Sequence, residues 1–275
     1  MDVVRISSGL LLAIVSILIF ALAPLRVVYV YAAVVGVLGL WEWVKLSGVY
    51  GLSSQIIVTA IIALSIYMME LMAQGDPLLG LAVLAVAALF WLLCFGLVLR
   101  YPHSAVFWRH KLSVKLFAGF IAFSGFWFAT LYLLAQSQNR YLVLTVVSLV
   151  AFADTGAYFS GRRFGKRKLS PRVSPGKSWE GVIGGMVLCA VFGIIIAAML
   201  LELDKAIVTG LILSMPVAVV SVVGDLTESM LKREAGCKDS SRLIPGHGGV
   251  LDRIDALIAG LPVFAGLHYL FVVAL

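Results

Sequence analysis

The sequence predicts an all-α polytopic membrane protein, and composition and spacing both point to it. Of the 275 residues, 62% are hydrophobic and only 13% are charged, and the mean hydropathy is +1.06. Soluble domains carry roughly 45–50% apolar and about 25% charged residues, so this chain has too little polar surface to cover a body in water. Apolar stretches of about 20 residues recur, and each can span a bilayer as a helix whose backbone amides are satisfied internally.

About nine spans are expected, near residues 7–23, 27–44, 52–72, 78–99, 113–135, 141–160, 181–201, 206–223 and 255–274. The first stretch is no cleavable signal peptide, because it exceeds signal-peptide length and another span follows at once. We divide the chain into an N-terminal membrane scaffold over 1–140, with five spans, and a C-terminal catalytic region over 141–275. Two long loops, 161–180 and 229–254, belong to the second region.

The distribution of cations orients these spans. If the N-terminus is cytoplasmic, only three of the 21 Lys and Arg residues lie outside, namely Arg26, Arg140 and Lys205. Cytoplasmic loops are enriched in Lys and Arg. The sequence therefore predicts a cytoplasmic N-terminus, an external C-terminus, and both long loops in the cytoplasm.

Acidic residues are scattered in the first half of the chain and gathered in the second. Glu42 and Glu70 each lie near the end of an apolar span, and we favour a structural role for both. From residue 154 onward eight of the ten acidic residues lie at or beside the two basic loops: Asp154, Glu180, Asp225, Glu228, Glu234, Asp239, Asp252 and Asp255. Carboxylates hold divalent cations while Lys and Arg neutralise phosphate oxygens. The pattern predicts a metal-plus-phosphate site, with Glu234 on an exposed loop outside it.

Four polar residues follow the eighth span at helical spacing. If the span continues as a helix, Asp225, Glu228, Ser229 and Lys232 recur at i, i+3, i+4 and i+7 and share one face. Decoration of a solvated helix end would explain Glu228 and Lys232 alone. It does not explain Asp225, which directly follows the apolar span.

The next segment combines a tight turn with two aspartates. Pro245 and the three glycines that follow it predict a turn that brings bare backbone amides close to anionic oxygens. Asp252 and Asp255 then open the last span. Helix capping is the alternative for Asp255, but it does not account for the whole polar cluster at the lip of an apolar helix.

The earlier loop carries Gly176-Lys177-Ser178, which suggests a nucleotide-binding P-loop. A P-loop needs a glycine five residues earlier, where this chain has Pro171, and a preceding strand, which we expect a membrane bundle to lack. That interpretation is rejected. A Lys and two hydroxyls opening a helix remain as a phosphate contact. The basic belt over 162–168 serves either anionic headgroups or substrate.

Together these residues resemble a known family, the phosphatidate cytidylyltransferases, or CDP-diacylglycerol synthases. The C-terminal match reads Ser229-x-Leu231-Lys232-Arg233, then Lys238-Asp239-x-Ser241, then Ile244-Pro245-x-His247-Gly248-Gly249-Val250-x-Asp252-Arg253-Ile254-Asp255. Asp154-Thr155-Gly156-Ala157-Tyr158, Gly161-Arg162, Phe164-Gly165-Lys166 and the block at 174–181 agree as well. At positions 176 and 178 the family more often has Lys and Thr. The first five spans are similar only in being apolar.

The resemblance implies a Mg²⁺-dependent reaction of CTP with phosphatidate that yields CDP-diacylglycerol and pyrophosphate, with a second cation as an option. We predict catalytic roles for Asp225, Ser229, Lys232, Lys238, Asp239, His247 and Asp252. We predict substrate contacts for Asp154, Ser174, Lys177, Glu180, Lys232, Arg233, Lys238, Gly248, Gly249 and Arg253. Metal ligation is predicted for Asp225, Asp252 and Asp255. His247 is expected to donate a hydrogen bond or organise the turn, because an ionised phosphate monoester needs no strong base.

The nearest alternative activity is that of a CTP-dependent enzyme acting on an isoprenoid glycerophosphate or a polyprenol. A transporter is disfavoured, since its charges would lie near the midplane of several spans, and no nucleic-acid partner is expected. The small-residue motif Gly181-x-x-x-Gly185 suggests a homodimer. The expected location is a bacterial inner membrane, with the active site on the cytoplasmic side.

Overall fold

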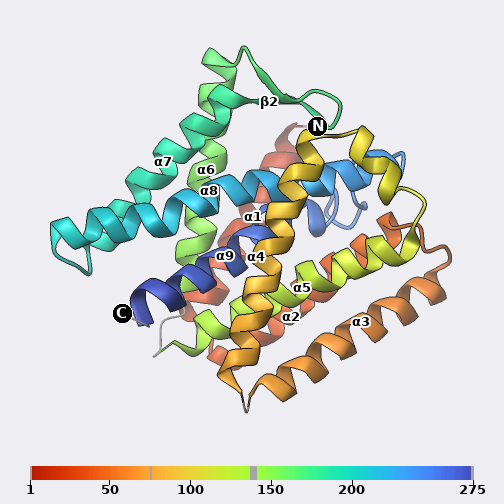
Figure 1. Ribbon diagram of the computed structural model, residues 1–275, viewed down its shortest axis with the longest axis horizontal. Coiled ribbons are helices and arrows are strands. Elements are labelled where there is room, and N and C mark those ends of the chain that lie inside the picture. Colours follow the sequence, from red (N-terminus) through yellow and green to blue (C-terminus); the bar gives the residue numbers. More distant parts are fainter. Residues whose placement is uncertain (1, 75, 137–140, 274–275) are drawn as a thin grey trace.

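The computed structural model describes residues 2–74, 76–136 and 141–273, which form a bundle of helices (Figure 1). The nine α-helices match the expected spans in order: α1 Asp2–Leu22, α2 Leu25–Leu46, α3 Leu52–Ala73, α4 Pro77–Leu99, α5 Leu112–Ala135, α6 Tyr141–Phe164, α7 Trp179–Ala198, α8 Leu203–Glu234 and α9 Leu251–His268. Short helices follow α4 (His103–Phe107) and α9 (Tyr269–Val273). Eight of the helices in the described ranges are long and apolar enough to cross a membrane. The all-α membrane fold is confirmed.

Helix α9 lies at the centre of the bundle, against α2, α4, α5 and α8 (Figure 1). Its Ile258, Leu261 and Phe264 are fully buried. On the outer helices the large apolar side chains point outward instead, as with Ile57 and Leu64 of α3. Apolar side chains can cover the outside of the bundle as well as fill its interior because the surrounding solvent is lipid.

Helices α6 and α7 pack through glycines. A Cβ at Gly156 would collide with the carbonyl oxygen of Gly184, and one at Gly185 would collide with that of Ala153. The backbones therefore approach as closely as small residues allow. Gly181 and Gly185 are both buried in this contact. The motif that suggested a homodimer is occupied within the chain, so it no longer supports a dimer, which stays a prediction without that support.

Helix α8 extends well beyond the expected end of its span at residue 223. At a rise of about 1.5 Å per residue its 32 residues reach about 48 Å, whereas the hydrocarbon core is about 30 Å thick. Asp225 and Lys232 therefore lie on a continuous helix, which confirms the shared face. The helix ends at Glu234, and Gly236 follows with a φ of 69°, which allows Cys237 N to donate to Lys232 O at 3.0 Å.

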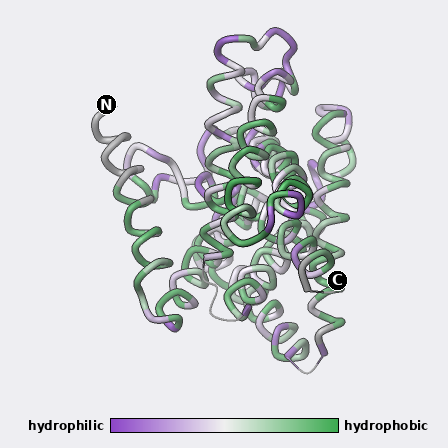
Figure 2. Tube along the Cα trace, turned by 90° about the vertical axis from the view of Figure 1, so that its left-hand side faces the viewer, coloured by the Kyte–Doolittle hydropathy of each residue, from purple (hydrophilic) through white to green (hydrophobic). Residues whose placement is uncertain are grey.

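A β-hairpin lies between α6 and α7. Strand β1 (Lys168–Ser170) pairs antiparallel with β2 (Ser174–Ser178), and the hairpin projects beyond the hydrophobic helices as a hydrophilic stretch (Figure 2). The expectation that the bundle has no strand is wrong, because the backbone outside the apolar spans can pair with itself. The P-loop stays excluded by Pro171.

Three polar segments meet at one end of the bundle. Tyr101 Oη donates to Glu234 Oε1 at 2.8 Å, which joins the α4–α5 connection to the end of α8. Arg233 Nε donates to Val173 O at 3.3 Å, which joins α8 to the hairpin. The two long loops, which the sequence predicts on the same side of the membrane, therefore meet at one end of the bundle. Of the three cations assigned to the opposite side, Arg140 lies outside the described residues.

Candidate active site

A buried ion pair connects α8 to α9. Lys232 Nζ lies 2.5 Å from Glu228 Oε2 and 2.5 Å from Asp252 Oδ1, and only 10% of the lysine side chain is exposed. The helices come this close because position 224 is glycine: a Cβ there would collide with the carbonyl oxygen of Asp255. Lys232 thus neutralises two carboxylates, and its predicted contact with phosphate stays a prediction.

Asp252 organises the turn that precedes α9. Its Oδ2 accepts hydrogen bonds from Ser240 N (2.9 Å), Ser240 Oγ (2.8 Å) and Gly249 N (2.8 Å), while its Oδ1 faces Lys232. Direct ligation of a metal would require the carboxylate to release some of these donors. Its predicted metal role stays a prediction.

Four charged groups from four elements converge beside this pair. Lys177 Nζ of β2 lies 2.6 Å from Asp225 Oδ2 of α8, and Ser229 Oγ donates to Asp225 Oδ1 at 3.2 Å. Asp154 of α6 interacts electrostatically with both Lys177 and Asp225. Asp255 of α9 interacts with Asp225 in the same way. Residues separated by more than a hundred positions in the sequence are thus brought together as predicted.

Glu228 supplies a carboxylate oxygen that the sequence reading left out of the ligand set. Its side chain is buried, and its Oε1 has no hydrogen-bond partner among the described residues. Its charge interacts with that of Asp255. Within the described ranges no three His, Cys, Asp or Glu side chains already stand as a metal site. An unsatisfied buried carboxylate oxygen next to two further carboxylates nevertheless fits a hard cation that also keeps water ligands.

A polar pocket of about 580 Å³ opens beside the ion pair. Its lining comes from the turn and the start of α9: Lys238, Asp239, Ser241, Arg242, Ile244, Pro245, Gly246, His247, Gly248 and Arg253. Gly248, with φ at 86°, accepts from Ile244 N at 2.8 Å and closes the turn. Three cations in one small pocket suit a polyanionic ligand.

The turn does not leave all its amides bare, contrary to expectation. Gly249 N is used by Asp252 at 2.8 Å, and His247 N donates to Ile244 O at 3.0 Å. These donors hold the turn to α9. The cations of the pocket, more than those amides, are therefore the groups available to an anion.

The hairpin residues divide into one site cation and several structural contacts. Lys177 faces Asp225, as described above. Glu180 accepts from Lys166 N at 3.1 Å and Arg167 N at 3.2 Å, and Ser178 caps α7 by accepting from Gly181 N at 3.1 Å. Ser174 pairs with Ser170 across the strands. In this structure Glu180 closes the base of the hairpin, and its predicted substrate contact stays a prediction.

The chain resembles known proteins over most of its length. The model of the cytidylyltransferase family matches residues 3–271, nearly the whole chain. The chain belongs to the cytidylyltransferase family. It is 43% identical over 233 residues to the phosphatidate cytidylyltransferase of Pseudomonas aeruginosa, covering 84% of this chain and 83% of the relative. It is 41% identical to that of Haemophilus influenzae over 281 residues, covering 96% and 97% respectively.

In this cytidylyltransferase Glu42 of α2 also reaches the site, which the sequence reading missed. Its carboxylate is 0% exposed and accepts four hydrogen bonds from the segment 240–251. A structural role was expected for Glu42, but near the membrane surface rather than beneath the turn. The sequence feature that could have indicated this position is a lone glutamate between Trp41 and Trp43 in an apolar span.

Glu234 is not the exposed residue that the sequence suggested. Its side chain is 7% exposed and lies 2.6 Å from Arg109 Nε. The expectation is wrong because α8 continues to this residue, and the α4–α5 connection folds over it. Burial and the hydrogen bond to Glu234 raise the pKa of Tyr101, so the phenol stays protonated at neutral pH and donates. The same carboxylate raises the pKa of the Arg109 guanidinium.

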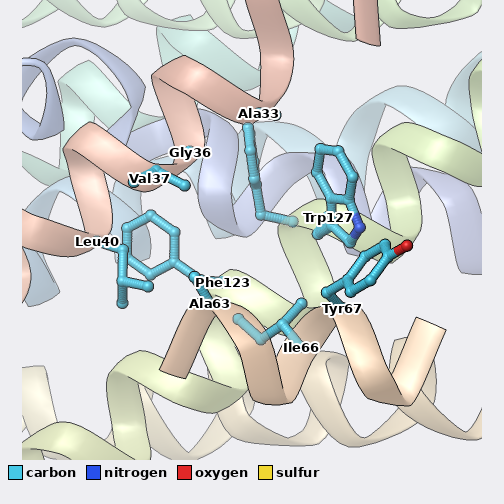
Figure 3. A pocket seen from close by; sticks show the side chains of 10 residues that line it. Ala33, Gly36, Val37, Leu40, Ala63, Ile66, Tyr67, Phe123 and Trp127 are labelled. Carbon is cyan, nitrogen blue, oxygen red and sulfur yellow. The ribbon is translucent and has the colours of Figure 1, made fainter. Parts of the chain in front are cut away.

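An apolar pocket of about 190 Å³ lies on the other side of α2, between α3 and α5 (Figure 3). Leu40, Ile66, Tyr67, Phe123, Phe126 and Trp127 line it together with smaller residues. None of the described residues that line it carries a charge, so it offers no group that would bind a phosphate. The polar pocket and the carboxylate cluster therefore define the candidate site of this family member.

Proposed function

We propose that this cytidylyltransferase transfers the cytidylyl group of CTP to phosphatidate, forming CDP-diacylglycerol and pyrophosphate. The observation that carries the proposal is the convergence of carboxylates and cations from α6, β2, α8 and α9 at the ends of membrane helices. CTP is a soluble polyanion, whereas phosphatidate is anchored in the bilayer by two chains. Both can meet only at such a boundary. The relatives named above carry the same activity in their names.

The chemistry needs positioning and charge stabilisation more than proton transfer. A phosphate oxygen of phosphatidate attacks the α-phosphorus of CTP, a new P–O bond forms, and the bond to the pyrophosphate oxygen breaks. Lys238, Arg242 and Arg253, which line the polar pocket, bind the phosphate chain. Lys177 holds Asp225 in place at 2.6 Å and adds positive charge beside the reacting groups.

Asp225, Asp255 and Glu228 would hold Mg²⁺ in this proposal. Support comes from Glu228 Oε1, which has no hydrogen-bond partner among the described residues, and from the mutual repulsion of Asp225 and Asp255, which a cation would relieve. When bound, Mg²⁺ neutralises phosphate charge and orients the triphosphate. Asp252 joins this set only by exchanging a hydrogen-bond donor for the metal.

We further place the site on the cytoplasmic side of a bacterial inner membrane, supported by the cation asymmetry. Single cysteines in the hairpin and in the 235–250 segment, in a chain whose native cysteines are replaced, test the orientation. A membrane-impermeant thiol reagent added outside sealed cells should leave both unlabelled. Labelling from outside contradicts the orientation.

The activity test incubates purified protein in detergent with labelled CTP, phosphatidate and Mg²⁺, and follows the CDP-lipid and pyrophosphate. We expect both products in equal amounts with wild type and neither with Asp225→Asn. A parallel reaction replaces phosphatidate with an isoprenoid glycerophosphate or a polyprenol. Product from such a lipid alone would overturn the proposal in favour of the alternative substrate class.

A further inference from the structure

We propose that Glu42 is a positioning residue for the reaction. Its carboxylate holds the segment 240–251 in place and, through Ser240, sets the orientation of Asp252. The inference rests on the proposed function only in the part of its test that measures enzyme kinetics. It assigns a role in the chemistry to α2, in the half of the chain that the sequence reading treated as scaffold.

The contacts of Glu42 are directed at a single segment. Oε1 accepts from Ser241 Oγ at 2.6 Å and from Val250 N at 3.1 Å. Oε2 accepts from Ser240 Oγ at 2.8 Å and from Leu251 N at 2.7 Å. The donors therefore include residues from both ends of the turn that lines the polar pocket. One carboxylate thus holds the two ends of that turn at a fixed separation.

These contacts require a carboxylate and not merely a polar side chain. A buried charge is costly unless hydrogen bonds replace its hydration, and none of the ion pairs among the described residues involves Glu42. The amides of Val250 and Leu251 open α9, where the helix dipole favours a negative charge. A neutral glutamine offers one acceptor oxygen and an amino group, which would face donors.

Ser240 links Glu42 to the ion pair of the site. Its hydroxyl lies 2.8 Å from Glu42 Oε2 and 2.8 Å from Asp252 Oδ2, and it has a single proton to share between them. From Asp252 the contacts continue to Lys232 and Glu228. Releasing Glu42 therefore moves the turn and also changes what holds Asp252 against Lys232.

Gly249 provides an independent way to disturb the same contact. A Cβ at this position would collide with Ser240 Oγ and with both carboxylate oxygens of Glu42. The φ of Gly249 is not positive, so an alanine at this position adds a steric clash without straining the backbone. Gly249→Ala should therefore mimic the loss of Glu42 while keeping its charge.

The experiment compares Glu42→Gln with Glu70→Gln, the same substitution at another glutamate near the end of an apolar span. Glu70 contacts Trp127 and Gln74, not the site. We expect Glu42→Gln to raise the KM for CTP at least tenfold and to lower kcat, while the KM for phosphatidate changes less than threefold. Glu70→Gln should match wild type in all three. Ser240→Ala combined with Glu42→Gln should add little to either single change, since both act through one contact.

A second readout needs no activity. Cys237 follows α8 directly and is the one partly exposed cysteine in the described chain, the other two being buried. Burial raises the pKa of the Cys237 thiol, so alkylation at neutral pH is slow and reports release of the segment. We expect faster alkylation in Glu42→Gln and in Gly249→Ala, and an unchanged rate in Glu70→Gln.

A purely structural Glu42 predicts a different result. In that case Glu42→Gln would reduce the amount of folded protein, while the KM for CTP and the alkylation rate of Cys237 in the remaining folded protein stayed at wild-type values. That outcome overturns the proposal. If Glu42→Gln does not fold, Ser241→Ala and Gly249→Ala decide by the same criteria. Absence of CDP-lipid in the wild type would contradict the proposed function alone, because the alkylation comparison would still stand.

Discussion

The two polar segments of this protein lie side by side, yet they are held in different ways. The segment 235–250 is fastened by buried groups: Glu42 beneath it, and Asp252 and Lys232 beside it. The hairpin is fastened by partly exposed groups. Lys177 and Asp225 have side chains that are 24% and 35% exposed, and the partly exposed Glu180 closes its base.

The difference separates a preorganised part of the site from an adjustable one. Hydrogen bonds in a low-dielectric interior are stronger and are not screened by salt. The turn that carries Lys238, and the start of α9 that carries Arg253, are therefore set before any substrate arrives. The hairpin brings Lys177 to the same place through contacts that water and salt can weaken, so this side can adapt to the triphosphate and the lipid.

The largest effect is expected for the carboxylates. Asp225→Asn keeps the volume but loses the charge proposed to hold Mg²⁺, so turnover should be abolished without unfolding. Asp252→Asn should also abolish turnover, and in addition lower the thermal midpoint, because its carboxylate holds Ser240, Gly249 and Lys232. Mg²⁺ titration and thermal denaturation in detergent measure both. Near-normal rates with unchanged Mg²⁺ dependence would show that this cluster is not the site.

Breaking the buried anchor comes next. Lys232→Met leaves Glu228 and Asp252 facing each other without a cation, which should reduce the free energy of unfolding by about 3–5 kcal/mol and remove activity. Arg253→Met is a matched control, since it removes a pocket cation on the exposed side. It should reduce CTP binding and leave stability close to wild type. Equal stability of the two variants would contradict a buried anchor.

On the hairpin side, Lys177→Gln removes a charge-assisted contact worth about 1.5–3 kcal/mol. The expected loss in kcat/KM is therefore about 10- to 100-fold. Raising the salt concentration should also lower the activity of the wild-type enzyme, because the contact is partly exposed and salt screens it. Lys168→Gln, in the upstream belt, should have a smaller effect. Similar losses at both positions would mean that belt and site act together.

The smallest effect is expected at the brace between the α4–α5 connection and α8. Glu234→Gln weakens the ion pair with Arg109, whose side chain is 43% exposed. Such pairs contribute about 1 kcal/mol or less. A small drop in thermal midpoint at unchanged KM is expected, and Arg109→Gln should reproduce it. A change in the KM for CTP would place this brace within the site.

Local patterns in the sequence were enough to predict the helices and much of the site. Apolar length gave nine helices, and the i, i+3, i+4, i+7 spacing placed Asp225 and Lys232 on one face, because helix geometry is set by neighbours in the chain. What the sequence could not supply was pairing at long range. Ser240 lies 198 positions from Glu42, and no local spacing connects them.

The same limit applies to Glu234 and to the small-residue motif at Gly181 and Gly185. Glu234 looked exposed because the end of α8 was placed too early, and the partner Arg109 lies 125 positions away. Gly181 and Gly185 carried a pattern typical of helix contacts, but the pattern does not say whether the partner helix belongs to the same chain. Here it is α6.

The length of α8 has a consequence for the membrane around the protein. A helix longer than the hydrocarbon core by several turns sets the depth at which Asp225 and Glu228 stand relative to the lipid headgroups. A thicker bilayer would draw these carboxylates down among the acyl chains, and a thinner one would lift them above the phosphates of the lipids. Bilayer thickness thereby becomes a parameter of the reaction, and turnover in vesicles of graded chain length should pass through a maximum.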